Sequence, residues 1–479
     1  MISRIFFWIG IFAFIAPNVN GQEVWTLERC IRYAQDNSRN VKQSQVLVKS
    51  AQLSNKLYRM QVYPSLSAGS NFGLNFGRSV NPSTYSFENS TTNYNSWSLN
   101  ASIPVYQGGY IKQEIRQTDA DLQASRSDLE QTQNTIALQV AQAYLQILLN
   151  DEQLANAKRR AEQDVAQADK VEKQINAGAL AQNARLDMKA QMARSEQQVV
   201  IADNNSELSY LNLKNLLELP PEQSLKVEKP NVTLPADVGN DVYVYKSIYT
   251  QALGFQPYIK AAEWRIKSAE FGLKAAEAQL KPSLYAQGSL SSNYSSSLRN
   301  FSEDVYNSVD VLFPVKVDGK PINATITQQQ LVTKGPTTSY FTQFGNNFGQ
   351  AIGLSLQIPI FSGLSRQINV QRQQLNIESQ NIALDKSKLQ LRSDIQTSLT
   401  NAKAARKQYD VAQKTYEAYK AAYSATEKRF AIGNANSFEV TQAKINLDNA
   451  ERDVTAAKYD FLFKLKIIDY YQGKKLVLN

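Results

Sequence analysis

The side chains that could do chemistry in this sequence are carboxylates and lysines, because it has no histidine and a single cysteine, Cys30. The lack of histidine removes His-based triads, His-metal sites and imidazole acid–base catalysis. Carboxylate catalysis would need a pair of acids and phosphate chemistry a glycine-rich loop, and neither motif is present. We therefore expect no enzyme, no catalytic residue, no metal site and no cofactor.

Cysteine use and charge point to no special partner. Cys30 has no intrachain partner for a disulfide and lies in a helix-like stretch, so we expect a small buried residue. It also lacks the apolar-small-small lead-in of a lipidated cysteine. The formal charge of +9 is spread among acids without a basic block, which favours a solvated surface over nucleic-acid binding.

The N-terminus has the layout of a secretory signal peptide over residues 1–21. One arginine precedes the apolar run Ile5–Ala16, and Pro17 and small or polar residues follow. The run of about 12 residues is too short to span a bilayer. We expect export across an inner membrane, with a retained interfacial anchor as the alternative.

The chain carries a long internal repeat. Ile103–Gly108 recurs as Ile358–Gly363, and in each copy 74 residues lead from the proline to a glycine, Gly178 or Gly433. So long a period marks two homologous halves rather than a solenoid. The expected organisation is repeat 1 at 22–218, an equatorial linker at 219–241, repeat 2 at 242–472 and a tail at 473–479.

Four segments alternate polar and apolar residues with period two, as strands do. In the fourth, Ile352, Leu354 and Leu356 alternate with Gly353 and Ser355. The polar face is small and uncharged, and about ten residues cross a bilayer when a strand is tilted. The pattern predicts transmembrane strands rather than the alternative, a soluble β-sandwich; they are expected at about 64–77, 95–105, 283–294 and 348–360.

Four strands cannot close a barrel, and lipid does not tolerate an open sheet edge. The chain must therefore pool its strands with copies of itself. Eight strands would give a packed interior, whereas twelve or more would leave room for a channel. The connection from about 295 to 347 is expected to be an outer loop, in which Phe313–Lys316 forms either a small hairpin or plain loop.

The rest of the sequence is helix-like. Gly108–Asn176 and Gly363–Ile432 each predict about 100 Å of helix, at about 1.5 Å per residue. Gly178 and Gly433 follow them and supply helix C-terminal caps, so the chain turns back there, unlike a plain fibrous coiled coil. Four helices half as long are expected at Thr26–Met60, Leu180–Leu217, Val242–Leu280 and Ser437–Tyr471.

This duplicated order of helix, two strands, long helix, glycine and helix resembles the TolC-like outer-membrane efflux protein family (outer membrane factors). The most recognisable stretch is Lys428–Val440, followed by Tyr459–Leu462. The resemblance implies an α+β membrane protein. Four transmembrane β-strands per chain would complete a β-barrel in a homotrimer, continued by a long α-helical coiled-coil barrel in the periplasm of a Gram-negative bacterium.

The resemblance also implies function and partners. The protein would be the outer-membrane exit duct of a tripartite efflux or type I secretion system. Its partners would be a periplasmic adaptor (membrane fusion) protein, an inner-membrane pump of the RND, ABC or MFS type, and outer-membrane lipid, but no nucleic acid. The alternative from the residues alone is a periplasmic coiled-coil structural or adaptor protein without a membrane barrel.

Docking residues follow from the same resemblance. The family's Val-Gly-Leu adaptor-docking motif matches Ala177-Gly178-Ala179 and Ile432-Gly433-Asn434, with only the glycines retained. The alternative is that each glycine serves the turn alone.

Candidate aperture residues lie beyond the glycines. The family places an acid six residues after each tip glycine. At the second tip this residue is Glu439. At the first tip it is Ala184, and Asp187 follows three residues later. Around a threefold axis, Asp187 and Glu439 would form carboxylate rings that favour cations, and otherwise they are ordinary surface acids.

Two further family positions differ in this chain. Gln442 stands in place of a second acid. The gate-locking tyrosine and arginine fall on Phe430 and Ala435, so the family's ionic lock cannot form in the same way.

The strand assignment makes a direct prediction. Replacing Leu354 or Leu356 with Arg is expected to impair outer-membrane assembly, because a lipid-facing Arg near the midplane costs about 2–4 kcal/mol. Changes at Ser355 or Gln357, on the opposite face, should leave assembly intact, as measured by the protein recovered in outer-membrane fractions. Equal effects on the two faces would refute the assignment.

Overall fold

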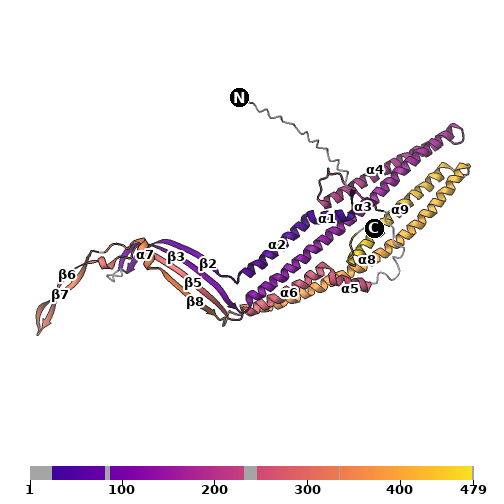
Figure 1. The fold of residues 1–479 in the computed structure, drawn as a ribbon. Coiled ribbons are helices and arrows are strands. Elements are labelled where there is room, and N and C mark those ends of the chain that lie inside the picture. The colour runs from indigo at the N-terminus through magenta and orange to yellow at the C-terminus, as the bar shows by residue number, and fades with distance from the viewer. Residues whose placement is uncertain (1–23, 81–86, 231–244, 334, 477–479) are drawn as a thin grey trace, which may run out of the picture. The chain divides into compact units, whose positions relative to one another are not determined.

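The computed structural model describes residues 24–80, 87–230, 245–333 and 335–476 (Figure 1). It divides into two compact units. The first comprises Met1–Gln52, Ala120–Lys267 and Glu378–Asn479, and the second comprises Leu53–Asp119 and Ser268–Ile377. The expected signal peptide lies outside the described residues.

A four-stranded antiparallel sheet forms the second unit's main body. Its strands are β2 (Ser65–Val80), β3 (Phe87–Gln107), β5 (Ser283–Ser295) and β8 (Gly349–Gln357), in the order β2-β3-β5-β8. Among the described strands, β2 and β8 are therefore edges with one neighbour each. The fourth strand ends at Gln357 rather than at 360 as expected; Pro359, just beyond it, has no N–H for a ladder.

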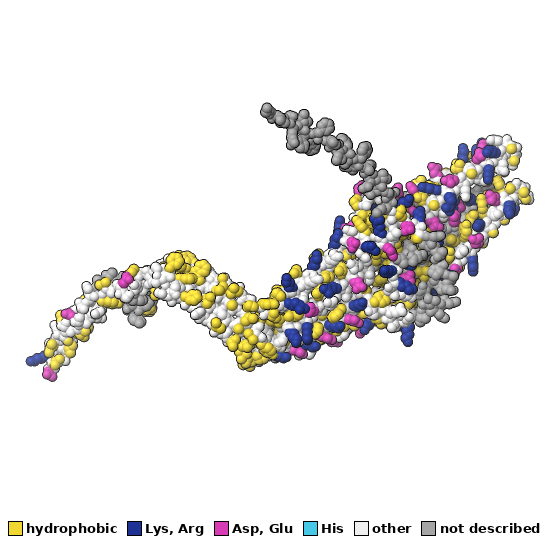
Figure 2. Space-filling view, viewed as in Figure 1, with side chains coloured by type: hydrophobic (Ala, Val, Ile, Leu, Met, Phe, Trp, Pro, Cys, Tyr) yellow, Lys and Arg dark blue, Asp and Glu magenta, His cyan; other side chains and the backbone are white. Residues whose placement is uncertain are grey.

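Register puts the apolar residues of all four strands on one face. Leu99 pairs with Leu290 and Ala286 with Leu354. The opposite face carries the small polar residues, for example Ser102 paired with Gln287. On the apolar face Leu354 is 72% exposed in the single chain. Figure 2 shows hydrophobic side chains gathered over this stretch, where charged side chains are sparse.

The connection between β5 and β8 is structured, unlike the plain loop considered from sequence. It contains a hairpin, β6 (Val305–Val317) and β7 (Lys320–Thr333), joined by Asp318 and Gly319 with φ of 53° and 77°. Positive φ at both positions is the geometry of a type I′ turn. Phe313–Lys316 thus belongs to a hairpin, far longer than the small one considered.

The short elements η1 (Phe301–Glu303) and α7 (Tyr340–Asn346) flank this hairpin. Gln343 of α7 is fully buried, accepts a hydrogen bond from the Ser295 N–H at 2.9 Å and donates one to its carbonyl at 3.0 Å. A buried amide with both groups satisfied anchors α7 to the end of β5.

Two helices of equal length dominate the chain, α3 (Tyr110–Asn176) and α8 (Ser365–Ala431), each of 67 residues. Each is followed by a helix of 35 residues, α4 (Asn183–Leu217) or α9 (Ser437–Tyr471). No helix in the described ranges combines the length and the apolar character needed to cross a membrane.

Two expected single helices are broken. Thr26–Met60 forms α1 (Leu27–Asn37) and α2 (Arg39–Met60), because Ser38 between them has an extended ψ of 131°. The other, over Val242–Leu280, forms α5 (Tyr245–Phe255) and α6 (Pro257–Ala278). Pro257 disfavours helical geometry at the residue before it, which interrupts the helix at Gln256.

Tyr144 of α3 lies at the centre of the first unit's largest hydrophobic cluster. Its ring is 1% exposed, and its hydroxyl lies 2.7 Å from the carbonyl oxygen of Glu228 and 3.2 Å from that of Trp25. Trp25 belongs to β1 (Val24–Trp25), and Glu228 directly follows β4 (Lys226–Val227); these two strands pair in parallel. Burial raises the pKa of Tyr144, so the hydroxyl remains a donor.

Tyr144→Phe is therefore expected to lower the free energy of unfolding by about 1 kcal/mol, since it removes one buried hydrogen bond. Thermal unfolding followed by circular dichroism measures the effect. Tyr419→Phe, on the exposed side of α8, is the matched control and should shift it by less than about 0.5 kcal/mol. Equal shifts for the two variants would contradict a structural role for the Tyr144 hydroxyl.

Candidate gate in the helical hairpins

Each long helix ends in the same capping geometry, which builds the two tips. Gly178 donates its N–H to the Ile175 carbonyl and Ala179 to that of Gln174, at 2.9 and 2.8 Å. At the second tip Gly433 donates its N–H to the Phe430 carbonyl at 3.0 Å, and Asn434 donates its N–H to the Arg429 carbonyl. These paired bonds form a Schellman motif, which places a left-handed residue after the helix.

The glycines are required by conformation rather than by crowding. Their φ values are +76° at Gly178 and +81° at Gly433, a region that side chains with a Cβ rarely adopt. A Cβ built on either would meet no atom within 4 Å. Ala177, Ala179, Ile432 and Asn434 beside them are exposed, so both expected docking triplets lie at the surface.

The first tip is closed by a small apolar cluster between α3 and α4. Val171 and Ile175 pack against Ala184 and Met188, each at most 8% exposed. Ala184 is therefore a packing residue, and the acid that the family places there has no counterpart at this position. Asp187 is exposed on α4, one residue before Met188.

Each hairpin also has an Arg–Glu pair between its two helices. In the first, Arg185 of α4 donates two hydrogen bonds to Glu172 of α3, at 2.8 and 2.6 Å, and this lowers the pKa of Glu172. In the second, Arg429 of α8 lies 3.4 Å from Glu439 of α9. Glu439 thus faces a cation of its own hairpin.

The other candidate aperture residues stand apart from that ion pair. Phe430 is half-buried, and its carbonyl serves the tip cap. Gln442 is exposed and donates to Asn446 on its own helix at 3.2 Å. The docking triplets and aperture candidates fall in two separate hairpins, with Asp187 in the first and Glu439 in the second.

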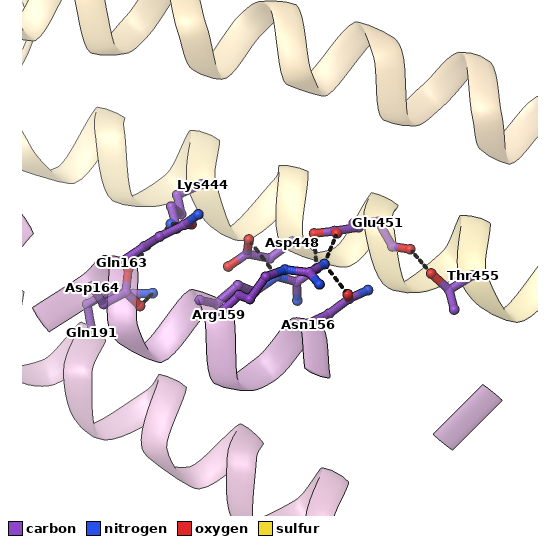
Figure 3. Close-up of polar contacts among 10 residues, drawn as sticks. Asn156, Arg159, Gln163, Asp164, Gln191, Lys444, Asp448, Glu451 and Thr455 are labelled. Carbon is purple, nitrogen blue, oxygen red and sulfur yellow. Dashed lines mark hydrogen bonds and ion pairs between the residues drawn. The ribbon is translucent and has the colours of Figure 1, made fainter. Parts of the chain in front are cut away.

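A network of ion pairs lies farther from the tips, between α3 and α9 (Figure 3). Arg160 of α3 lies 3.1 Å from Asp448 and 2.6 Å from Glu451 of α9. One turn on, Asp164 of α3 lies 3.5 Å from Lys444 of α9. We call these five residues the charge cluster; Gln191 of α4 joins it by donating to Asp164 at 3.1 Å.

The charged side chains of the cluster are largely buried, so solvent and salt screen their interactions little. The side chains of Asp164, Lys444, Arg160 and Asp448 are 4%, 13%, 19% and 20% exposed. Removing either sign from such a site leaves the other sign poorly solvated.

Asp448 is the titrating member of the cluster. Burial raises its pKa to about 6, although Arg160 and Lys444 lower it, while Asp164 and Glu451 raise it further. With this pKa, the carboxyl group of Asp448 gains or loses its proton near pH 6.

Sequence reasoning missed the charge cluster, although a signal was present. Arg160 and Asp164 are four residues apart on one helix, and Lys444, Asp448 and Glu451 follow at spacings of four and three on another. Each set falls on one helix face. The pairing of the two faces could not be seen without the fold, because 284 residues separate Arg160 from Lys444.

A cavity of about 400 Å³ adjoins the cluster between α3, α4 and α9. Amide, hydroxyl and charged side chains line it, including Asn156, Gln191, Arg194 and Ser195. The two hairpins are therefore not packed tightly on one another here, and the ion pairs of the charge cluster make much of the contact between them.

This arrangement links the two hairpins through ion pairs. Within the described ranges, no cluster of three or more acidic, cysteine or histidine side chains could hold a metal ion.

Comparisons with known proteins agree with this architecture. The family model described as outer membrane efflux protein matches residues 30–218 and 323–465. No curated protein matches the sequence.

Several solved structures share the fold. The outer membrane protein VceC of Vibrio cholerae aligns with a TM-score of 0.71 at 16% identity, covering 94% of this chain and 96% of its own. CusC aligns with a TM-score of 0.73 at 16% identity, covering 94% of this chain and 92% of its own. The outer membrane channel CmeC of Campylobacter jejuni aligns with a TM-score of 0.69 at 17% identity, covering 93% of this chain and 85% of its own. With the family model matching well over half of its residues, the chain belongs to the outer membrane efflux protein family.

Proposed function

We propose that this outer-membrane efflux channel works as a homotrimer whose three sheets close into one twelve-stranded barrel. The observation that carries the proposal is the sheet β2-β3-β5-β8, with one apolar face and an unpaired strand at each edge of the described sheet. Lipid requires every backbone group to be paired, and pairing β2 of one copy with β8 of the next satisfies both edges.

As a family member, the protein is a passive channel of the outer membrane with a large periplasmic helical part, and it is not an enzyme. The alternative, a periplasmic coiled-coil protein without membrane strands, has no support. The matched family and the solved channels favour efflux, and we keep type I secretion as the second use of the same duct.

The hairpin tips suit docking of a helical partner. Besides the docking triplets, Leu186 and Phe438 are 66% and 69% exposed near the two turns. Exposed apolar side chains beside polar ones mark a protein contact. We assign this contact to the periplasmic adaptor protein, which couples the duct to an inner-membrane pump.

We assign the gate to the charge cluster, which replaces the ionic lock lost at Phe430 and Ala435. It joins the first hairpin, through α3, to the second, through α9. In the closed state these ion pairs hold the hairpins together. Docking of the adaptor opens the duct by binding the separated arrangement more tightly.

Arg160→Ala is expected to favour the open state, because it leaves Asp448 and Glu451 without their main cation and so destabilises the closed state by about 2 kcal/mol. Single-channel conductance in planar bilayers should rise. The conservative variant Arg160→Lys should keep part of the closed behaviour, since it retains a cation facing Asp448 and Glu451.

The matched control is Arg452→Ala, because Arg452 is 53% exposed and its contact with Asp453 is 3.9 Å long. An exposed pair of this kind contributes little. If Arg160→Ala conducts like the unmodified protein and Arg452→Ala, the gate assignment is wrong. If no variant conducts, the channel proposal itself fails.

Asp448 gives the gate a dependence on pH. Its pKa is raised to about 6 in the closed packing and returns towards its ordinary value near 4 when hydrated. The closed state therefore binds the proton more tightly, and acidification from about pH 7 to pH 5 stabilises it. Conductance should fall over that range.

Asp448→Asn removes the titrating group and should flatten this part of the pH profile, while Asp453→Asn, on the exposed side of α9, should keep it. A conductance that rises on acidification, or a profile unchanged in Asp448→Asn, contradicts the assignment.

A further inference from the structure

The hairpin β6–β7 has an apolar face with no assigned role. It forms a separate two-stranded sheet, and β6 lies wholly outside the residues matched by the family model. The family match therefore describes most of β7 but not its partner strand β6.

Register separates two chemically different faces on this hairpin. Val311 pairs with Ile326 and Val315 with Ile322, so these side chains share a face. The opposite face is mixed: Asp310 pairs with Thr327, whereas Leu312 pairs with Thr325. We call the first the apolar face of the hairpin; its main members are Val309, Val311, Phe313, Val315, Ile322 and Ile326.

This face is open in the single chain. Val309, Phe313 and Ile326 are 39%, 45% and 54% exposed. A two-stranded hairpin is only marginally stable alone in water, and burial of a contiguous apolar face supplies the missing stability. The face therefore needs an occupant.

We propose that the apolar faces of hairpins β6–β7 from different copies of the chain pack on one another beyond the membrane, an inference that rests on the proposed trimer. The hairpin is inserted between β5 and β8, the inner and edge strands of the sheet that closes the barrel. Every copy in a closed ring then presents the same face at the same end of the sheet.

Charge permits this self-association. The two strands and their turn carry two acids, Asp310 and Asp318, and two bases, Lys316 and Lys320. The hairpin is thus neutral overall, so that copies meet without net repulsion.

Lipid is the weaker occupant. A two-stranded ribbon has unpaired backbone groups along both outer edges, and hydrocarbon does not tolerate them. Packing between copies buries only the side-chain face and leaves both edges in water.

Disulfide trapping tests the inference. Val315→Cys places a thiol on the apolar face and Thr325→Cys, paired with Leu312, places a matched one on the opposite face. The native Cys30 is fully buried, and burial raises its pKa to about 12, so it does not react under mild oxidation. Oxidation in outer-membrane fractions followed by non-reducing electrophoresis should give several-fold more linked dimer for Val315→Cys.

Native mass spectrometry of the same variants separates the possible failures. A trimer with no linked dimer at Val315→Cys, or with equal linkage at both positions, overturns the hairpin proposal and leaves the channel proposal standing. Protection of Val315→Cys from both oxidation and a water-soluble maleimide, while Thr325→Cys reacts, indicates lipid and also overturns it. If the unmodified protein shows no trimer, both the hairpin proposal and the proposed trimeric barrel are wrong.

Discussion

Pairing of backbone groups in lipid is the constraint on which the rest of this molecule depends. The four described strands form a sheet with an apolar face and two unpaired edges, which hydrocarbon does not tolerate, and this is why we propose a closed assembly of copies. Because α3 begins three residues after β3 ends, closing the proposed ring would also bring together the helices that follow the strands.

The gate that we propose in the helical part needs contacts that can be both made and broken. Apolar packing holds the first unit around Tyr144, where motion would expose a large buried cluster. Nearer the tips the contact between α3 and α9 is instead a charge cluster beside a cavity of about 400 Å³. Ion pairs in partly buried sites cost desolvation as well as gaining attraction, which keeps their net contribution small enough for a partner to overcome.

Much of this could be predicted from the sequence, because period-two alternation and long helix-forming runs are local signals. Leu354 and Ser355 were assigned to opposite faces correctly, and the two 67-residue helices were expected within a few residues. The breaks at Ser38 and Gln256 were missed, although Pro257 was a signal for the second. The hairpin β6–β7 is longer than expected, and its Asp318-Gly319 turn is the local signal for it.

The charge cluster could not be found in this way, since its pairing joins helices far apart in the sequence, and Ala184 showed its packing role only in the fold. We propose that each chain supplies one third of a barrel. Native mass spectrometry of the protein extracted from outer membranes counts the chains. We expect three copies in a stable complex; a stable monomer or dimer with membrane-inserted strands would show that the proposed barrel is wrong.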